Sequence, residues 1–307
     1  MRWYKIIAAG MTFDATQDPN ALNVELDIVV AAEHLPKSGS FARVWGISLQ
    51  TLLNAKQYNN QPIYVYAGMQ QGLPLANPAE QGLLTYGKIF PALGNWVGTD
   101  MTLDFYILAD AGVPIVPKAA NVIHNWPAGQ PMSQAIKQTL TTAYPSYTPV
   151  INISPKLVLS YTDTGYYQSI GQYATYIFNI SNSIMNSSSY HGVQMHFKNK
   201  QIIVNDGTVK GNSFTVNFQD LIGQPIWTGP ITIQFKTVMR GDADVGMTAI
   251  LPQSLATLTY ASGTQSGGSA SNVIQGNFTV TSIRHTGNFR QPDWPSWCST
   301  FEARMAS

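Results

Sequence analysis

Two stretches decide the fold class of this chain: DLIGQPIWTGPITIQFKTVMRGDADVGMTAILP, residues 220–252, and GNFTVTSIRHTGNFRQPDWPSWCSTFEA, residues 276–303. Residues 231–235 alternate apolar and polar side chains, as a strand with one face in a core does. The turn formers GDADVG then precede a second apolar run, which predicts a hairpin. A further strand pair is predicted at 277–283 and 297–301, because the two prolines between them mark a loop. Four such strands without a convincing helix predict a small closed or nearly closed β-barrel.

The amino-terminal part shows the same strand patterning. Strands are expected near residues 21–30, 40–47, 63–68, 86–90 and 101–108, with a short helix near residues 48–58. A weak internal repeat is also present: Trp45-Gly46-Ile47 and Ile222-Gly223-Gln224 each have a central glycine next to a predicted strand. We therefore predict two similar β-barrel domains, at residues 1–120 and 211–307.

Residues 121–210 have a different character. Helices are predicted at 131–144 and 168–185, where apolar residues recur every three to four positions and Pro131 suits a first helical turn. Residues 193–197 and 201–206 then predict a hairpin. The fold class we expect is mainly β with an α+β insert: two small β-barrel domains that flank a small α/β domain.

The composition favours a protein that is assembled with neighbours. Charged residues make up only 11% of the chain and the net charge is +1, whereas about a quarter of the residues are charged in typical soluble domains. This balance gives no general attraction to nucleic acid, so we expect no sequence-specific binding to it. The single cysteine, Cys298, excludes an intramolecular disulfide, and no stretch has the length of a membrane span or the pattern of a signal peptide.

Several short motifs resemble one protein family. They are I-G-Q-P at 222–225, G-x-I-x-I at 229–233, G-x-F-x-V-x-x-I-R-H-x-G-N-F-R at 276–290, W-x-x-x-F at 297–301 and the helix entry G-Q-P-M-x-x-A-I-K at 129–137. Their order resembles that of baseplate hub proteins of tailed bacteriophages. The resemblance implies a non-enzymatic homotrimer without cofactor or metal, which joins a hexameric tail tube protein to a trimeric spike protein and contacts other baseplate proteins. An axial channel for DNA, a place in the virion and assembly in the host cytoplasm are also implied.

Residues that could carry chemistry are few. Asp100 and Asp104 could share a strand face as a glycosidase pair does, which keeps a tail-associated cell-wall hydrolase as an alternative. A hexameric tail-tube or distal-tail protein is a second alternative. Asp242 and Asp244 lack the further ligands of a calcium loop and are expected in a plain turn. No catalytic, cofactor-binding or metal site is predicted.

The aromatic residues of the last barrel are the candidate interface. Large aromatic side chains in loops are common anchors of protein interfaces. The alternative is that they fill the barrel ends of their own subunit. The four candidates are Trp227, Phe289, Trp294 and Trp297.

Overall fold

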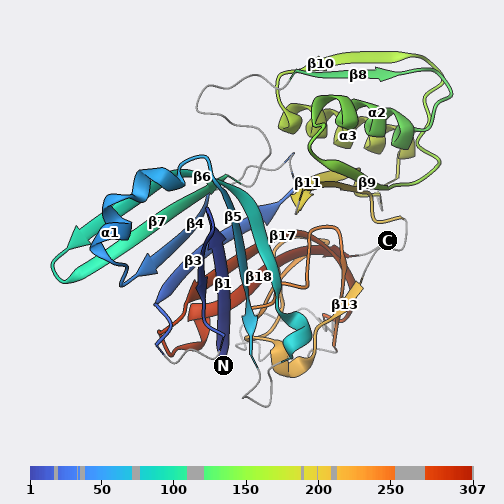
Figure 1. Cartoon of the computed structure of the whole chain (residues 1–307). Helices are drawn as coiled ribbons and strands as arrows, with labels where there is room; N and C mark the ends of the chain where they lie inside the picture. Colours follow the sequence, from blue (N-terminus) through green and yellow to red (C-terminus); the bar gives the residue numbers. More distant parts are fainter. Residues whose placement is uncertain are drawn as a thin grey trace, which may run out of the picture.

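The computed structural model describes residues 1–16, 20–32, 34, 39–70, 77–108, 121–187, 190–198, 200–208, 213–252 and 274–305. Within them the protein is mainly β, as predicted, with one 13-stranded sheet and a smaller part that holds the two long helices (Figure 1). No helix among the described residues is long and apolar enough to cross a membrane.

The sheet takes strands from both ends of the sequence. The first half contributes β1 (Arg2–Ala8), β2 (Met11–Asp14), β3 (Val24–Ala31), β4 (Ser40–Trp45), β5 (Pro62–Met69), β6 (Gly82–Val97) and β7 (Asp100–Leu108). The second half contributes β13 (Ser213–Thr215), β14 (Ile226–Trp227), β15 (Thr232–Val238), β16 (Thr248–Leu251), β17 (Gly276–Asn288) and β18 (Trp297–Met305). The order is β14-β15-β18-β17-β3-β4-β7-β6-β5-β1-β2, and β16 joins β17 to β13.

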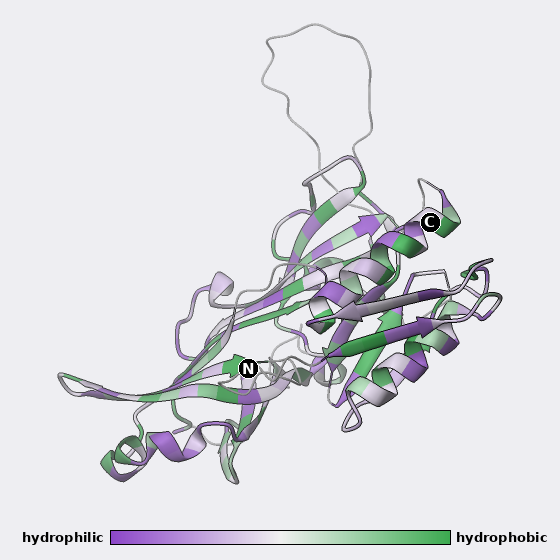
Figure 2. Cartoon of the chain, turned by 90° about the horizontal axis from the view of Figure 1, so that it is seen from above, coloured by the Kyte–Doolittle hydropathy of each residue, from purple (hydrophilic) through white to green (hydrophobic). Residues whose placement is uncertain are grey.

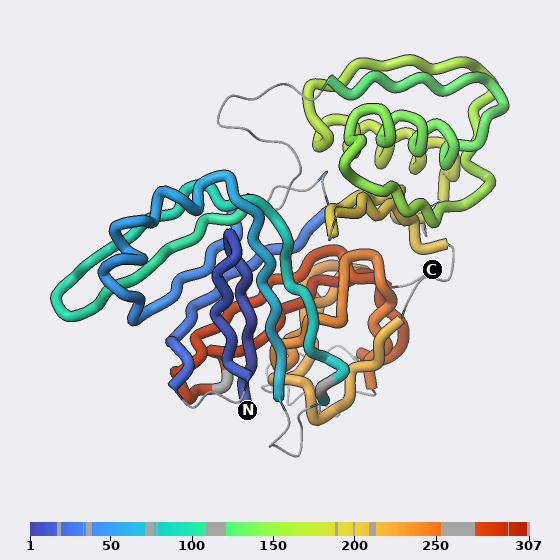
Figure 3. Tube along the Cα trace, in the orientation of Figure 1, coloured from blue at the N-terminus to red at the C-terminus, as the bar shows by residue number. Residues whose placement is uncertain are grey.

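The pairing of β3 with β17 corrects the prediction of two separate barrels. These strands run antiparallel from Ser282 opposite Ala31 to Asn288 opposite Glu25, while β17 pairs with β18 along its other edge. The chain trace shows the two halves side by side at this contact (Figure 3). Each half satisfies the edge backbone groups of the other, so the described strands form one continuous sheet instead of two closed rings.

The predicted hairpin between residues 231–235 and 247–251 is also wrong. β15 pairs with β14 and β18, whereas β16 pairs with β13 and β17. The turn formers between them lie in a loop that makes long-range contacts: the Gly241 amide donates to the Glu80 carbonyl, at the end of the 3₁₀ helix η2 (Pro78–Glu80), with an N···O distance of 2.7 Å. The predicted pairing of β17 with β18 is confirmed.

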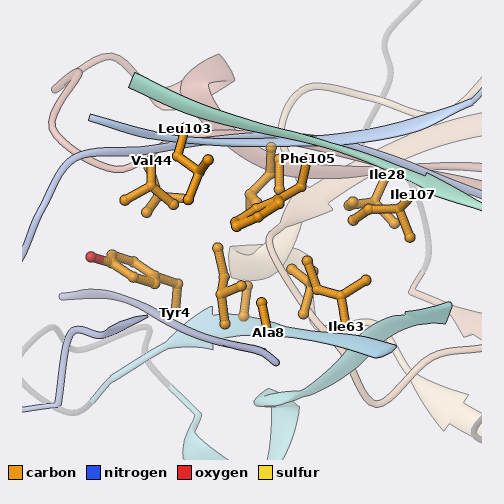
Figure 4. Close-up of a cluster of buried hydrophobic side chains, with 14 of the residues drawn as sticks. Tyr4, Ala8, Ile28, Val44, Ile63, Leu103, Phe105 and Ile107 are labelled. Atoms are coloured by element: carbon orange, nitrogen blue, oxygen red, sulfur yellow. The ribbon is translucent and has the colours of Figure 1, made fainter. Parts of the chain in front are cut away.

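The first half of the sheet curves around a hydrophobic core. Figure 4 shows Tyr4, Ala8 and Ile63 on one side of this core, with side chains of β7 such as Phe105 facing them. Trp297 of the second half belongs to the same cluster. A separate cluster fills the second half, built from β13 and β15–β18 with neighbouring loop residues.

The α/β part has its own core. Its helices α2 (Met132–Ala143) and α3 (Ile170–Met185) lie between a two-stranded and a three-stranded sheet (Figure 1). The strands are β8 (Val122–Trp126), β9 (Thr148–Asn152), β10 (Asp163–Tyr167), β11 (Gln194–Lys198) and β12 (Gln201–Asn205). Both predicted helices and the β11–β12 hairpin are confirmed. The predicted domain boundaries at 120/121 and 210/211 fall at or beside residues outside the described part and stay predictions.

Candidate assembly surface

Two of the four candidate aromatic residues pack against their own chain, Trp297 buried and Phe289 half-buried. Trp297 is 2% exposed, and its indole N–H donates to the Gly68 carbonyl with an N···O distance of 3.0 Å. Phe289 packs edge-on against Tyr4, with ring centroids 4.9 Å apart. Gly68 and Tyr4 belong to the first half, so these contacts join the two halves of one subunit.

Trp227 lies at the open end of the sheet. It belongs to the two-residue edge strand β14, is 40% exposed, and approaches Phe278 with ring centroids 6.4 Å apart. Ile226 and Ile231 beside it are 54% and 41% exposed. We call Ile226, Trp227 and Ile231 the edge patch. The side chain of Trp294 lies outside the described residues.

A second group of exposed apolar residues lies at the tip of the β6–β7 hairpin, which projects from the sheet (Figures 1 and 2). The short helix α1 (Leu49–Leu53) packs along this hairpin, because Gly94 leaves room: a β-carbon there would lie 2.7 Å from the Leu52 carbonyl oxygen. We call the exposed apolar residues of hairpin and helix the arm patch: Leu49, Leu53, Leu93, Trp96 and Val97. These residues were not predicted from the sequence, although Trp96 beside the turn at Gly98 could have indicated them.

Two pairs of charged residues cross from strand to strand on the sheet. Arg43 of β4 binds Asp104 of β7 through two nitrogens, at N···O distances of 2.7 and 2.8 Å. Arg284 of β17 binds Asp27 of β3 in the same way, at 2.8 and 2.7 Å. These hydrogen bonds raise the pKa of both arginines. The second pair lies on the seam between the two halves.

The candidate catalytic acids are not brought together. Asp104 is 2% exposed and is occupied by Arg43, and the Asn95 amide also donates to it. Asp100 is exposed at the arm tip. Four residues of strand separate the two by about 13 Å, beyond the usual spacing of a glycosidase pair.

Asp242 and Asp244 do more than form a turn. Asp242 binds Arg240, which is 2% exposed, through two nitrogens at 2.8 and 2.7 Å. Arg240 also lies 3.8 Å from a carboxylate oxygen of the buried Glu80. Burial raises the pKa of Glu80, and Arg240 opposes this rise. This buried cluster ties the second half of the sheet to the first, which no local sequence pattern could indicate.

Asp244 links the sheet to the α/β part. Its carboxylate lies 3.2 Å from Nε2 of His196 and 2.9 Å from Nζ of Lys198, both on β11. Burial alone would raise the pKa of Asp244, but these two groups outweigh it and lower the pKa to about 2. His191 does not take part in this cluster of Asp244, His196 and Lys198; its Nε2 lies 2.9 Å from the Met305 carbonyl oxygen. Among the described residues, no group of His, Cys, Asp or Glu could hold a metal ion.

Known structures resemble the chain in fold. No family model and no curated protein sequence matches it. The 43 kDa tail protein of prophage MuSo2 from Shewanella oneidensis is 7% identical, with a TM-score of 0.52, 99% of this chain covered and 96% of that one. A tail protein from Neisseria meningitidis MC58 is 9% identical, with a TM-score of 0.47 and coverage of 99% and 96%. A chain of a PdpA–VgrG complex is also 9% identical, with a TM-score of 0.45 and coverage of 99% and 64%. The first likeness shows that the chain shares the fold of a prophage tail protein over its whole length.

Proposed function

We propose that this chain is a structural protein of a phage tail, the baseplate hub that joins a hexameric tail tube to a trimeric spike. The observation that carries the proposal is the fold likeness to a prophage tail protein, which covers 99% of this chain. The hub motifs and the low charge content agree with it. Its site of action would be the baseplate of the virion, after assembly in the host cytoplasm, with other baseplate proteins as neighbours.

The arrangement of the sheet in two halves would suit a protein that joins a sixfold tube to a threefold spike. Three copies around one axis would present six half-sheets, two from each chain, because each chain holds one half on either side of the β3–β17 seam. If the two half-sheets take equivalent places around the axis, a threefold ring can meet a sixfold tube, and closed symmetric assemblies are the usual form of oligomers. The centre of such a ring leaves an axial passage for DNA. Obligate contacts of this kind commonly bury more than about 2,000 Å².

The proposed role requires no catalysis and no cofactor. The surroundings of Asp100 and Asp104, the candidate glycosidase carboxylates, support a role without catalysis. Asp104 is bound by Arg43 and lies four residues along the strand from Asp100. We expect purified protein to release no sugar from bacterial cell walls. If cleavage is found and is lost in an Asp100→Asn/Asp104→Asn double variant, the hydrolase alternative is correct and the structural proposal is wrong.

Subunit number tests the hub proposal directly. Sedimentation velocity at micromolar concentration should give a trimer, and electron micrographs of the purified ring should show threefold symmetry. A hexamer would instead indicate a tail-tube or distal-tail protein. A compact monomer at high micromolar concentration would contradict both forms of assembly.

A further inference from the structure

The α/β part is a unit that is complete without the large 13-stranded sheet. Its helices α2 and α3 pack with its five strands around a core of their own. Those strands form two small sheets, and within the described residues none of them joins the large sheet. Because its core and its strand pairings are internal, the α/β part can keep its fold in more than one orientation relative to the large sheet.

One buried carboxylate, in the loop between β15 and β16, holds the α/β part in place. The three-stranded sheet of the α/β part lies toward the large sheet (Figure 1), and two basic side chains of its strand β11 reach Asp244. The carboxylate lies 3.2 Å from Nε2 of His196 and 2.9 Å from Nζ of Lys198. The side chain of Asp244 is only 9% exposed, and removal of one partner from a buried ion pair leaves a charge uncompensated. These contacts therefore oppose any turn of β11 away from the large sheet.

Three further contacts across the joint involve no pair of opposite charges. Nε2 of His191 lies 2.9 Å from a backbone carbonyl oxygen at the end of β18, and the ring of His34 stacks on Phe178 of α3 with centroids 4.4 Å apart. At the end of β12, Asn205 lies against Gly246, where a β-carbon would collide with the Asn205 amide. Contacts without a charge pair are cheaper to break than a buried ion pair, so the contacts of Asp244 contribute most to the orientation.

The apolar packing of the joint leaves a gap. A cavity of about 30 Å³ lies between Phe197 and Lys198 of β11 on one side and Ala31, Leu84 and Asp244 on the other. Such a cavity has room for a water molecule, whereas well-packed interiors have few voids larger than that. The apolar surfaces at the joint are therefore not fully interlocked, and the orientation depends on the polar contacts around Asp244.

We propose that the α/β part can turn as one body relative to the large sheet, and that Asp244 holds it in the orientation described here through His196 and Lys198. Hinge motions of this kind leave the packing within each part unchanged and alter only the contacts at the joint. In an assembled particle, the α/β part could then follow a moving neighbour while the large sheet stays in place. The inference rests on the fold of the chain and does not depend on the hub proposal.

Distances between two spin labels test the joint in the full chain. The labels are attached at Lys137→Cys on α2 and Lys88→Cys on β6, two exposed positions, in a Cys298→Ala background that removes the single native cysteine. Labelled chains are diluted with unlabelled ones, so that only distances within one chain are measured. Asp244→Asn keeps the shape of the side chain but removes its charge. The distance distribution measured by pulsed electron resonance should therefore become at least twofold wider in this variant.

Asp27→Asn is the matched control, because it breaks an exposed ion pair within the large sheet and should leave the distribution unchanged. Hydrogen exchange separates motion from unfolding: the amides of α2 and β17 should keep their protection in Asp244→Asn. An unchanged distribution in Asp244→Asn, or equal widening in Asp27→Asn, would overturn the inference. Loss of protection in α2 would also overturn it, because Asp244 would then support the fold of the α/β part instead of its orientation.

Discussion

The backbones of Gly82 and Gly241 touch where the two halves of the sheet meet. A β-carbon on Gly82 would lie 2.3 Å from the carbonyl oxygen of Gly241, and one on Gly241 would lie 2.6 Å from the carbonyl carbon of Gly82. Both neighbours are backbone atoms, which cannot rotate away as a side chain can. Glycine is therefore required at both positions by close approach of the chain to itself.

We predict that Gly82→Ala and Gly241→Ala each lower the free energy of unfolding by about 1–3 kcal/mol, the usual cost of overpacking. Urea unfolding followed by circular dichroism measures this change. Gly39→Ala is the matched control, because a β-carbon on Gly39 meets no atom within 4 Å, and its effect should stay within about 0.5 kcal/mol. Equal stability of all three variants would contradict the close contact.

We predict that Arg240→Met lowers the free energy of unfolding by more than the two glycine variants do. Replacement by Met keeps much of the apolar volume but leaves Glu80, which is 2% exposed, without its cation. Breaking a buried ion pair by removing one partner costs about 3–5 kcal/mol. Arg284→Met is the control: its side chain is 59% exposed, and an exposed pair contributes about 1 kcal/mol or less. Similar urea midpoints for the two variants would refute a special role for Arg240.

Local sequence patterns predicted the elements but not all of their partners. Helices α2 and α3 and the β17–β18 pair follow from periodicity and turn residues over a few positions, and they were found. Periodicity shows that a segment is a strand with one buried face, but it does not show which edge it meets. The β3–β17 seam joins residues more than 250 positions apart, so strands that suggested two barrels form one sheet.

The surroundings of single site residues depend on the fold in the same way. Trp297 was a candidate for the interface because large aromatic residues are common anchors of interfaces. In the structure it is buried in its own chain, and its indole N–H donates to the Gly68 carbonyl. Asp244 was expected in a plain turn because the further ligands of a calcium loop are missing. Its partners on β11, His196 and Lys198, precede it by more than 40 residues and could not be inferred from the turn motif. Burial and long-range partners depend on the fold, and neither appears in a short motif.

Two buried histidines predict a loss of stability in mild acid. His124 and His285 are each 1% exposed, and burial lowers the pKa of both to about 4. Since the unfolded value is about 6.5, the unfolded chain takes up protons first as the pH falls. The stability is therefore complete above pH 6.5 and declines toward pH 4, by up to about 3 kcal/mol for each group.

Urea unfolding at several pH values between 7.5 and 4 measures this decline. His285→Gln keeps a hydrogen-bonding group near the Ser299 hydroxyl, which lies 2.8 Å from Nδ1 of His285, but it cannot take up a proton in this range. The variant should lose stability at pH 7.5 and show a shallower decline toward pH 4 than the wild type. An unchanged slope would show that His285 does not titrate on unfolding.

Trp227 and Trp297 should respond to substitution in opposite ways. Trp297→Phe removes the hydrogen bond from the buried indole to the Gly68 carbonyl, so unfolding should become easier by about 0.5–1.5 kcal/mol. Trp227 is 40% exposed on an edge strand, so Trp227→Ser should cost less stability. Because it also shrinks the edge patch, it should raise the concentration for half-assembly. Urea unfolding and sedimentation velocity on both variants separate the two effects. Weaker assembly of Trp297→Phe at unchanged stability would show that Trp297 acts at the interface after all.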